Sequence, residues 1–171
     1  DVDGTLTDAQ GRVSESYAHA LRYIAQFVPL YLATSLSMQQ ARRKLGKALF
    51  SLFEGGVFAD GGLLVYGGQS RCMPVELLLD INEESAKITA HKYSMLVYDK
   101  EERINILSRL KEKPYQVFYK PPLITVIHKE VDKRKGVLHI CKALAFPLDQ
   151  VLIVGNSLKD WEMMSVVSHS C

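Results

Sequence analysis

Short apolar segments that run directly into polar residues recur along this chain, and they constrain its fold more than any other feature. Residues 28–33 (VPLYLA) end at Thr34 and Ser35, and residues 151–154 (VLIV) end at a Gly-Asn-Ser turn. Each segment has the length of a buried strand, and apolar residues with helical spacing fill stretches between them. Strands that alternate with helices indicate an α/β domain built on a parallel sheet flanked by helices.

The same patterns predict the elements along the chain. The expected helices run from residue 14 to about 25, from 37 to about 52, over 100–112, from 135 to about 144 and from about 161 onward. The expected strands are 28–33, 57–60, 63–66, 91–98, 115–119, 123–128 and 151–154. Gly55 and Gly56 are expected to end the second helix, and residues 74–90 fit either a helix or a strand followed by a helix.

Polar side chains gather at the ends of the expected strands. Asp1 and Asp3 lie in a glycine-containing turn, Thr34 and Ser35 follow one strand, and residues 156–160 follow another. In open α/β sheets the ligand binds beyond the carboxyl ends of the strands. We therefore expect these residues to meet in one crevice, although they are far apart in sequence.

These residue types suit phosphoryl transfer. A carboxylate can attack phosphorus and form an aspartyl-phosphate, and a second carboxylate two residues later can protonate the leaving group and then activate water. Clustered carboxylates and a phosphate repel one another, and Mg²⁺ relieves this repulsion with one or two carboxylates, phosphate oxygens and water as ligands. Thr34 and Ser35 can donate hydrogen bonds to the phosphoryl group, and Lys135 can supply a fixed positive charge.

Composition excludes several other classes of protein. The net charge is only +2, which does not favour a nucleic-acid partner. No apolar run approaches the roughly 18 residues needed to span a membrane, so a membrane partner is not expected. The three cysteines are widely spaced, which favours reduced thiols and a cytoplasmic protein. The sequence identifies no protein partner.

Four segments, in order, resemble the motifs of the haloacid dehalogenase (HAD) superfamily. Residues 1–7 (DVDGTLT) are similar to motif I and residues 32–35 (LATS) to motif II. Lys135-Gly136 is similar to motif III, and residues 154–160 (VGNSLKD) are similar to motif IV. A further turn, Asp60-Gly61-Gly62, resembles the Asn-Gly-Ala turn that precedes the cap in the Cof-type and sucrose-phosphatase-like branch.

The resemblance implies a Rossmann-like core with a small cap inserted between motifs II and III. The core would comprise residues 1–67 and 131–171, and a C2-type α+β cap would comprise residues 68–130. It also implies a strand before Asp1, which would lie centrally in the sheet.

The activity implied is that of a Mg²⁺-dependent phosphatase acting on a small phosphorylated metabolite such as a sugar phosphate. Asp1 would be the nucleophile and Asp3 the general acid and base. Phosphate would be bound by Thr34, Ser35 and Lys135, with Lys135 bridging Asp1 and the phosphate. The implied Mg²⁺ ligands are Asp1, the backbone carbonyl of Asp3, Asn156 and Asp160.

Two departures from the branch leave other functions open. Asn156 and Lys159 replace the first Asp and the Asn of the usual Gly-Asp-x-x-Asn-Asp motif, which should weaken Mg²⁺ binding. Motif II continues as Thr-Ser-Leu instead of the common Thr-Gly-Arg, so a phosphate-side arginine is absent. One alternative is a catalytically silent homologue that binds a phosphorylated ligand or a protein. Another is a phosphotransferase or mutase that passes the phosphoryl group to a second hydroxyl.

Overall fold

The computed structural model describes residues 1–72, 86–89, 92–111 and 113–171, with only the backbone of 86–89, 92–95 and 159. It divides the chain into two compact units. The first comprises Asp1–Met73 and Asp132–Cys171, and the second comprises Pro74–Val131. Most of the ambiguous stretch 74–90 lies outside the described residues.

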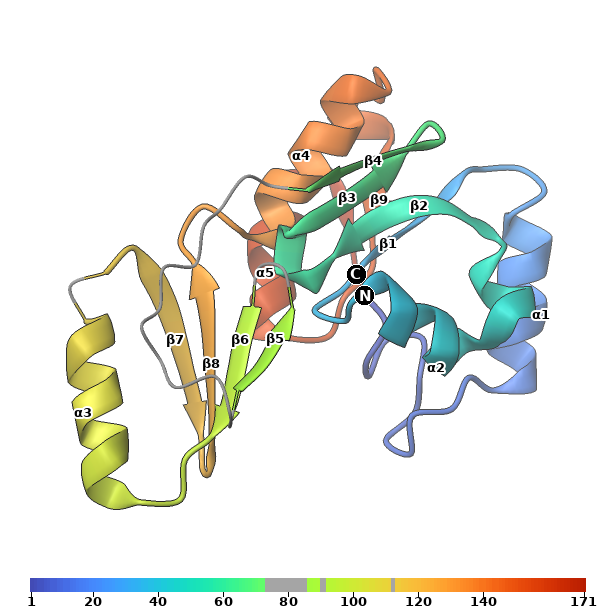
Figure 1. Cartoon of the computed structure of the whole chain (residues 1–171). Helices are drawn as coiled ribbons and strands as arrows, with labels where there is room; N and C mark the ends of the chain where they lie inside the picture. The colour runs from blue at the N-terminus through green and yellow to red at the C-terminus, as the bar shows by residue number, and fades with distance from the viewer. Residues whose placement is uncertain (73–85, 90–91, 112) are drawn as a thin grey trace. The chain divides into compact units, whose positions relative to one another are not determined.

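The first unit is built on a four-stranded sheet (Figure 1). Its strands follow the order β1 (Leu30–Ala33), β2 (Phe53–Phe58), β3 (Leu63–Tyr66) and β4 (Gln69–Cys72). The pair β1–β2 is parallel, whereas β2–β3 and β3–β4 are antiparallel. The predicted α/β fold is confirmed, but the sheet is mixed, because the short connections around β3 permit only antiparallel pairing.

Helices and two short strands complete the first unit. The helices are α1 (Glu15–Ile24), α2 (Met38–Phe50), α4 (Lys133–Ala143) and α5 (Leu158–Met164), with 3-10 turns at Ala59–Gly61 and Leu148–Gln150. Strand β9 (Leu152–Ile153) pairs in parallel with β10 (His169–Ser170). The predicted caps are present, since Ser14 accepts from the Tyr17 backbone N–H and Ser37 forms a capping box with Gln40.

Helices cover both faces of this sheet. Successive residues of a strand point to opposite faces, and Val57 and Phe58 of β2 accordingly join different cores. Phe58 packs in a cluster with Leu32 of β1 and Leu45 of α2. Val57 packs in a second cluster with Ile140 of α4. The first unit is therefore a three-layer arrangement of helix, sheet and helix.

Gly55 and Gly56 lie inside β2 and do not end the second helix, so that prediction was wrong. A Cβ on Gly56 would lie 2.5 Å from the carbonyl oxygen of Leu32, and one on Gly55 would collide with the carbonyl of Val65. The neighbouring backbones approach so closely that only glycine fits at these two positions. Two consecutive glycines after a helical pattern resemble a helix stop. The close approach of the neighbouring strands, which explains them here, cannot be read from the local sequence.

The second unit pairs one helix with an antiparallel sheet. The sheet order is β5 (Ala86–Thr89), β6 (Lys92–Leu96), β8 (Leu123–His128) and β7 (Tyr115–Lys120), and the helix is α3 (Lys100–Leu110). A core that includes Ile106, Leu110 and Val126 lies between them. Strand β4 belongs to the first unit because it pairs with β3, whereas the insert was predicted to begin at residue 68.

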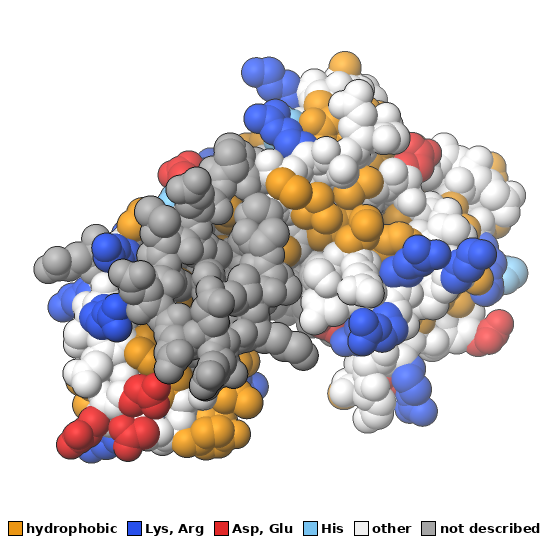
Figure 2. Space-filling view, viewed as in Figure 1, with side chains coloured by type: hydrophobic (Ala, Val, Ile, Leu, Met, Phe, Trp, Pro, Cys, Tyr) orange, Lys and Arg blue, Asp and Glu red, His pale blue; other side chains and the backbone are white. Residues whose placement is uncertain are grey.

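Basic side chains gather on the surface of the first unit along α2. Arg42, Arg43, Lys44 and Lys47 are all exposed there, as charged residues of a surface helix usually are. Lys and Arg side chains are visible on the side of this unit drawn in Figure 2. Within the described part of the chain, no helix has the length and apolar character needed to cross a membrane.

Candidate active site

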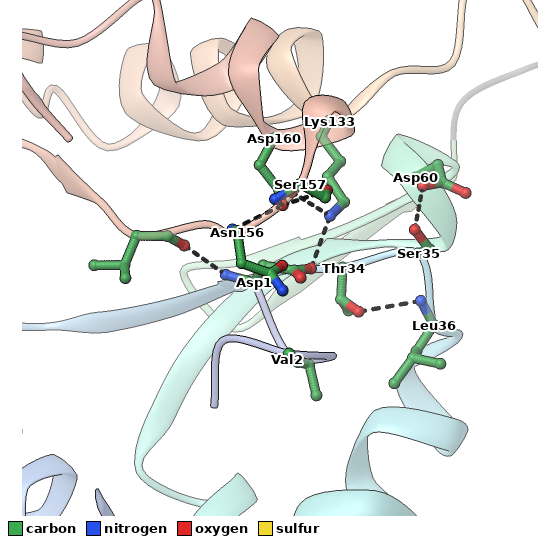
Figure 3. Close-up of polar contacts among 12 residues, drawn as sticks. Asp1, Val2, Thr34, Ser35, Leu36, Asp60, Lys133, Asn156, Ser157 and Asp160 are labelled. Atoms are coloured by element: carbon green, nitrogen blue, oxygen red, sulfur yellow. Dashed lines mark hydrogen bonds and ion pairs between the residues drawn. The ribbon is translucent and has the colours of Figure 1, made fainter. Parts of the chain in front are cut away.

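A buried lysine joins two carboxylates that are distant in sequence. Lys133 Nζ lies 2.8 Å from Asp1 Oδ1 and 2.8 Å from Asp160 Oδ1 (Figure 3). The exposed side-chain fractions are 5% for Lys133, 8% for Asp1 and 0% for Asp160. Moving a charged side chain out of water costs free energy, so buried charges are normally paired and hydrogen-bonded. The three side chains therefore form one electrostatic unit, in which removal of Lys133 would leave two buried carboxylates without their counter-charge.

The position of Lys133 at the start of α4 also points to a functional role. The helix begins after Asp132, whose side chain caps it by accepting from the Lys135 backbone N–H at 2.6 Å. A cation in the first helical turn opposes the helix dipole and is unfavourable there by itself. The attraction of Asp1 and Asp160 outweighs that penalty and draws the Lys133 ammonium into the interior.

Lys135, the lysine selected from the sequence, lies elsewhere. Its Nζ is 3.8 Å from Asp132 Oδ2, and 44% of its side chain is exposed. Lys135 was expected to bridge Asp1 and the phosphate, but Lys133 is the lysine that contacts Asp1, and it also contacts Asp160. The Lys135-Gly136 pair suggested a motif, but Gly136 is required for packing, since a Cβ there would lie 2.6 Å from Val57 Cγ1. Asp132, a good N-cap residue, directly precedes Lys133. It is the sequence signal that could have placed Lys133 at the start of the helix.

The loop after β9 is folded around Asp160. Asp160 Oδ2 accepts from Ser157 Oγ at 2.7 Å, from the Ser157 backbone N–H at 3.1 Å and from the Asn156 backbone N–H at 3.3 Å. Burial by itself would raise the pKa of Asp160, but the hydrogen bonds from Lys133 and Ser157 outweigh it and hold that pKa below its ordinary value. Asp160 is thus kept as a carboxylate.

Asn156 lies beside the motif I turn. Its side chain occupies the space that a Cβ on Gly4 would need, and Gly4 has a φ of +78° that favours glycine. Asn156 is an exposed residue. The side chain of Lys159 is outside the described part of the structure.

Asp1 and Asp3 have different surroundings. Val2 between them is fully buried in the core of the first unit, which directs its two neighbours away from that core. The Asp1 nitrogen donates to the Val154 carbonyl at 2.9 Å, which ties motif I to the end of β9. Asp3 forms an ion pair with Lys44 of α2, and 48% of its side chain is exposed. The structure therefore brings Asp1 together with Asp160, while Asp3 is engaged by a different cation.

The end of β1 forms the remaining part of the site (Figure 3). Thr34 is 1% exposed, and its Oγ1 accepts from the Leu36 backbone N–H at 3.2 Å. Ser35 Oγ donates to Asp60 Oδ1 at 2.6 Å, and the Asp60 backbone N–H donates to the Thr34 carbonyl at 3.1 Å. The turn at Asp60 was predicted from the sequence, but its contact with Ser35 was not.

The oxygen atoms of the site fit a hard cation that takes few ligands from protein. Among the described residues, no group of three or more His, Cys, Asp or Glu side chains is arranged to hold a metal ion. Both oxygens of Asp160 accept hydrogen bonds, and Asp1 Oδ1 accepts from Lys133. Asp1 Oδ2 and the Asn156 amide oxygen are the remaining oxygen atoms that could coordinate a metal ion. Mg²⁺ suits this set because it usually keeps several waters and binds substrate phosphate.

Comparison with known proteins identifies the family and the fold of this chain. The sequence model of the haloacid dehalogenase-like hydrolase family matches residues 72–171. No curated protein matches the chain by sequence. A hypothetical protein from Geobacillus kaustophilus HTA426 superposes with a TM-score of 0.77 at 16% identity, over 99% of this chain and 83% of that one.

Two further solved structures share the fold. A haloacid dehalogenase-like hydrolase from Bacteroides thetaiotaomicron has a TM-score of 0.76 at 14% identity, covering 98% of this chain and 84% of that chain. The HAD subclass IIB sugar phosphatase BT4131 has a TM-score of 0.72 at 15% identity, covering 99% of this chain and 84% of that chain. The family match covers more than half of this chain and shows that it belongs to the haloacid dehalogenase-like hydrolases.

Proposed function

We propose that this chain is a Mg²⁺-dependent phosphohydrolase that releases phosphate from a monoester of a small metabolite through an aspartyl-phosphate. The observation that carries the proposal is the buried bridge from Lys133 to Asp1 and Asp160. A fixed ammonium beside a carboxylate nucleophile orients it and places positive charge where an incoming phosphoryl group needs it. A purely structural ion pair would not need to lie at the carboxyl end of the sheet.

In the first step, an Asp1 carboxylate oxygen attacks phosphorus. The bond from phosphorus to the ester oxygen breaks, and the leaving group departs with that electron pair. Asp3 is the proposed proton donor to the departing oxygen, which requires it to be protonated and to separate from Lys44. Lys133 and Thr34 would hold the phosphoryl oxygens, and Asp160 would keep Lys133 in place.

In the second step, water attacks phosphorus of the aspartyl-phosphate and gives up a proton to Asp3. The acyl-phosphate bond breaks, and Asp1 returns as a carboxylate with release of inorganic phosphate. Mg²⁺, when bound, would neutralise charge on the nucleophile and phosphate. Asp1 and Asn156 would hold it, with the carbonyl of Asp3, and Asp160 would act on the site through Lys133 and the loop.

A sugar phosphate is the proposed substrate class. The solved sugar phosphatase BT4131 shares the fold, but the identity of 15% carries only an analogy. The proposal is tested by phosphate release from p-nitrophenyl phosphate and a panel of sugar phosphates, with Mg²⁺ or with EDTA. Turnover that needs Mg²⁺ and disappears in Asp1→Asn is expected, whereas turnover that survives in Asp1→Asn overturns the assignment of the nucleophile.

A silent binding protein is the second candidate, and a specific observation favours it. Asn156 contributes no negative charge to the site, and both oxygens of Asp160 are engaged by protein donors. This candidate predicts that inorganic phosphate binds to the folded chain, measured by calorimetry, while none of the phosphate esters is turned over at millimolar Mg²⁺.

A further inference from the structure

The Ser35 hydroxyl has its hydrogen committed to a carboxylate. Ser35 Oγ lies 2.6 Å from Asp60 Oδ1, and Asp60 is only 7% exposed. A hydroxyl group has one hydrogen to donate and two lone pairs with which to accept. While the bond to Asp60 is kept, Ser35 offers a neighbouring group an acceptor and no donor.

Asp60 is held in this position by its own backbone. Ala59, Asp60 and Gly61 have successive φ values of 51°, 58° and 111°, and residues other than glycine rarely adopt such values. The Asp60 backbone N–H donates to the Thr34 carbonyl at 3.1 Å, and the Ala59 N–H donates to the Leu36 carbonyl at 2.8 Å. A strained turn persists where its surroundings fix it, and this one is fixed to the loop after β1.

Two adjacent hydroxyl groups of that loop consequently have different roles. Thr34 Oγ1 accepts from the Leu36 backbone N–H at 3.2 Å, so its hydrogen is available to a phosphoryl oxygen. The oxygens of a phosphate dianion only accept, so Ser35 has no hydrogen to offer them while it donates to Asp60. A hydroxyl on the leaving group suits Ser35 better, because it can donate to Oγ and is uncharged.

We propose that Ser35 is a specificity residue that accepts a hydrogen bond from a hydroxyl of the leaving group. Asp60 is the positioning residue that keeps the Ser35 hydrogen turned away from the substrate. Figure 3 shows this pair beside Thr34, on the side of the sheet where Asp1 and Lys133 meet. This inference rests on the proposed phosphohydrolase function and narrows its substrates to phosphate esters of hydroxylated compounds.

The test compares two esters with leaving groups of similar size on the full chain with Mg²⁺. Glucose 6-phosphate carries hydroxyls, and cyclohexylmethyl phosphate carries none. We expect a kcat/KM ratio of at least about tenfold in favour of glucose 6-phosphate, since an acceptor that the substrate covers without offering a donor is penalised. Ser35→Ala is expected to bring the ratio close to one. Ser37→Ala is the matched control, because that hydroxyl caps α2, and it should keep the wild-type ratio.

Variants of Asp60 separate positioning from a structural role. Asp60→Asn retains an acceptor oxygen for Ser35 and tolerates positive φ, so the substrate ratio should persist. Asp60→Ala leaves the Ser35 hydrogen available to phosphate. The ratio should then fall, and inorganic phosphate should inhibit several-fold more strongly than in the wild type. A merely structural defect would weaken phosphate inhibition instead.

The outcomes distinguish this inference from the function on which it rests. If the wild type hydrolyses both esters with equal kcat/KM, or if Ser35→Ala keeps the preference, the specificity role is overturned and the hydrolase stands. If Asp60→Ala weakens phosphate inhibition, the positioning role is overturned. A third outcome would be that the folded wild type releases no phosphate from any compound tested, whether the two esters, p-nitrophenyl phosphate or the sugar phosphates. Both proposals would then fail.

Discussion

The ammonium of Lys133 lies 2.8 Å from the carboxylate of Asp1, a residue 132 positions earlier in the chain. This contact links the first turn of α4 to motif I, and the same ammonium reaches Asp160. It makes Lys133 the residue whose replacement tests the site most directly.

Replacing this lysine should affect both activity and stability. In Lys133→Met we expect kcat/KM for p-nitrophenyl phosphate to fall by about 10²–10³, as when a transition-state donor is removed. Unpairing two buried carboxylates should also lower the free energy of unfolding by about 3–5 kcal/mol at neutral pH. Lys135→Met is the matched control, and its kcat/KM should stay near the wild-type value. A loss in Lys135→Met with none in Lys133→Met would contradict the assignment of the lysine.

Stability should depend on acid pH through Asp160. The pKa of its carboxyl group is lowered from an ordinary value of 3.8, so the unfolded chain binds this proton more tightly than the folded chain does. The contribution of Asp160 is present above the ordinary value and is lost as pH falls toward the lower folded pKa. The free energy of unfolding of Asp160→Asn should therefore fall less steeply than that of the wild type as pH drops through this range.

Urea unfolding from pH 6 to pH 2.5 measures that difference. Glu162→Gln, an exposed change in the same helix, serves as the control for a lost carboxylate. Parallel pH curves for the wild type and Asp160→Asn would show that Asp160 does not carry this dependence.

A methyl group added at Gly136 should destabilise the first unit. Alanine normally favours a helix over glycine by about 1 kcal/mol, but here the new Cβ would lie 2.6 Å from Val57 Cγ1 and 3.1 Å from Leu64 Cδ2. We expect Gly136→Ala to cost about 1–3 kcal/mol of unfolding free energy from overpacking. Thermal or urea unfolding measures the effect.

A double variant provides the control. Val57→Ala removes the colliding methyl groups, so the penalty of Gly136→Ala should shrink in the Val57→Ala background. Strictly additive effects would mean that the two side chains do not compete for this space.

Restoring a carboxylate in motif IV should strengthen metal binding. In Asn156→Asp we expect the Kd for Mg²⁺, measured by calorimetry with inorganic phosphate present, to fall about tenfold, since Mg²⁺ prefers charged oxygen ligands. Ser157→Ala, which keeps the charge of the loop unchanged, should show no such gain. An unchanged Kd in Asn156→Asp would place the ion away from residue 156.

Local patterns predicted much of this fold because their causes are local. Apolar periodicity identified the helices capped by Ser14 and Ser37 and the strand that ends before Thr34. Helix caps and alternating burial depend on residues within one or two turns of each other. The order of the motifs was likewise sufficient to identify the family.

Contacts between distant segments were decided only in three dimensions. The glycines at 55 and 56 belong to a strand because the carbonyls of Val65 and Leu32 approach them, and neither carbonyl is close in sequence. Ser35, which follows β1, is hydrogen-bonded to Asp60, which follows β2 and is 25 positions later in the chain.

The sequence alone determined the α/β class and the family, and it named Asp1 and Asp160 among the residues proposed to carry phosphoryl chemistry. It did not determine which of two lysines reaches Asp1, because Lys133 and Lys135 are equal in charge and two residues apart. Successive helical positions differ by about 100° in direction, and the position where Asp132 caps α4 sets which lysine points inward. Only the tertiary structure, which places Asp1 and Asp160 against the first residue of that helix, selects Lys133.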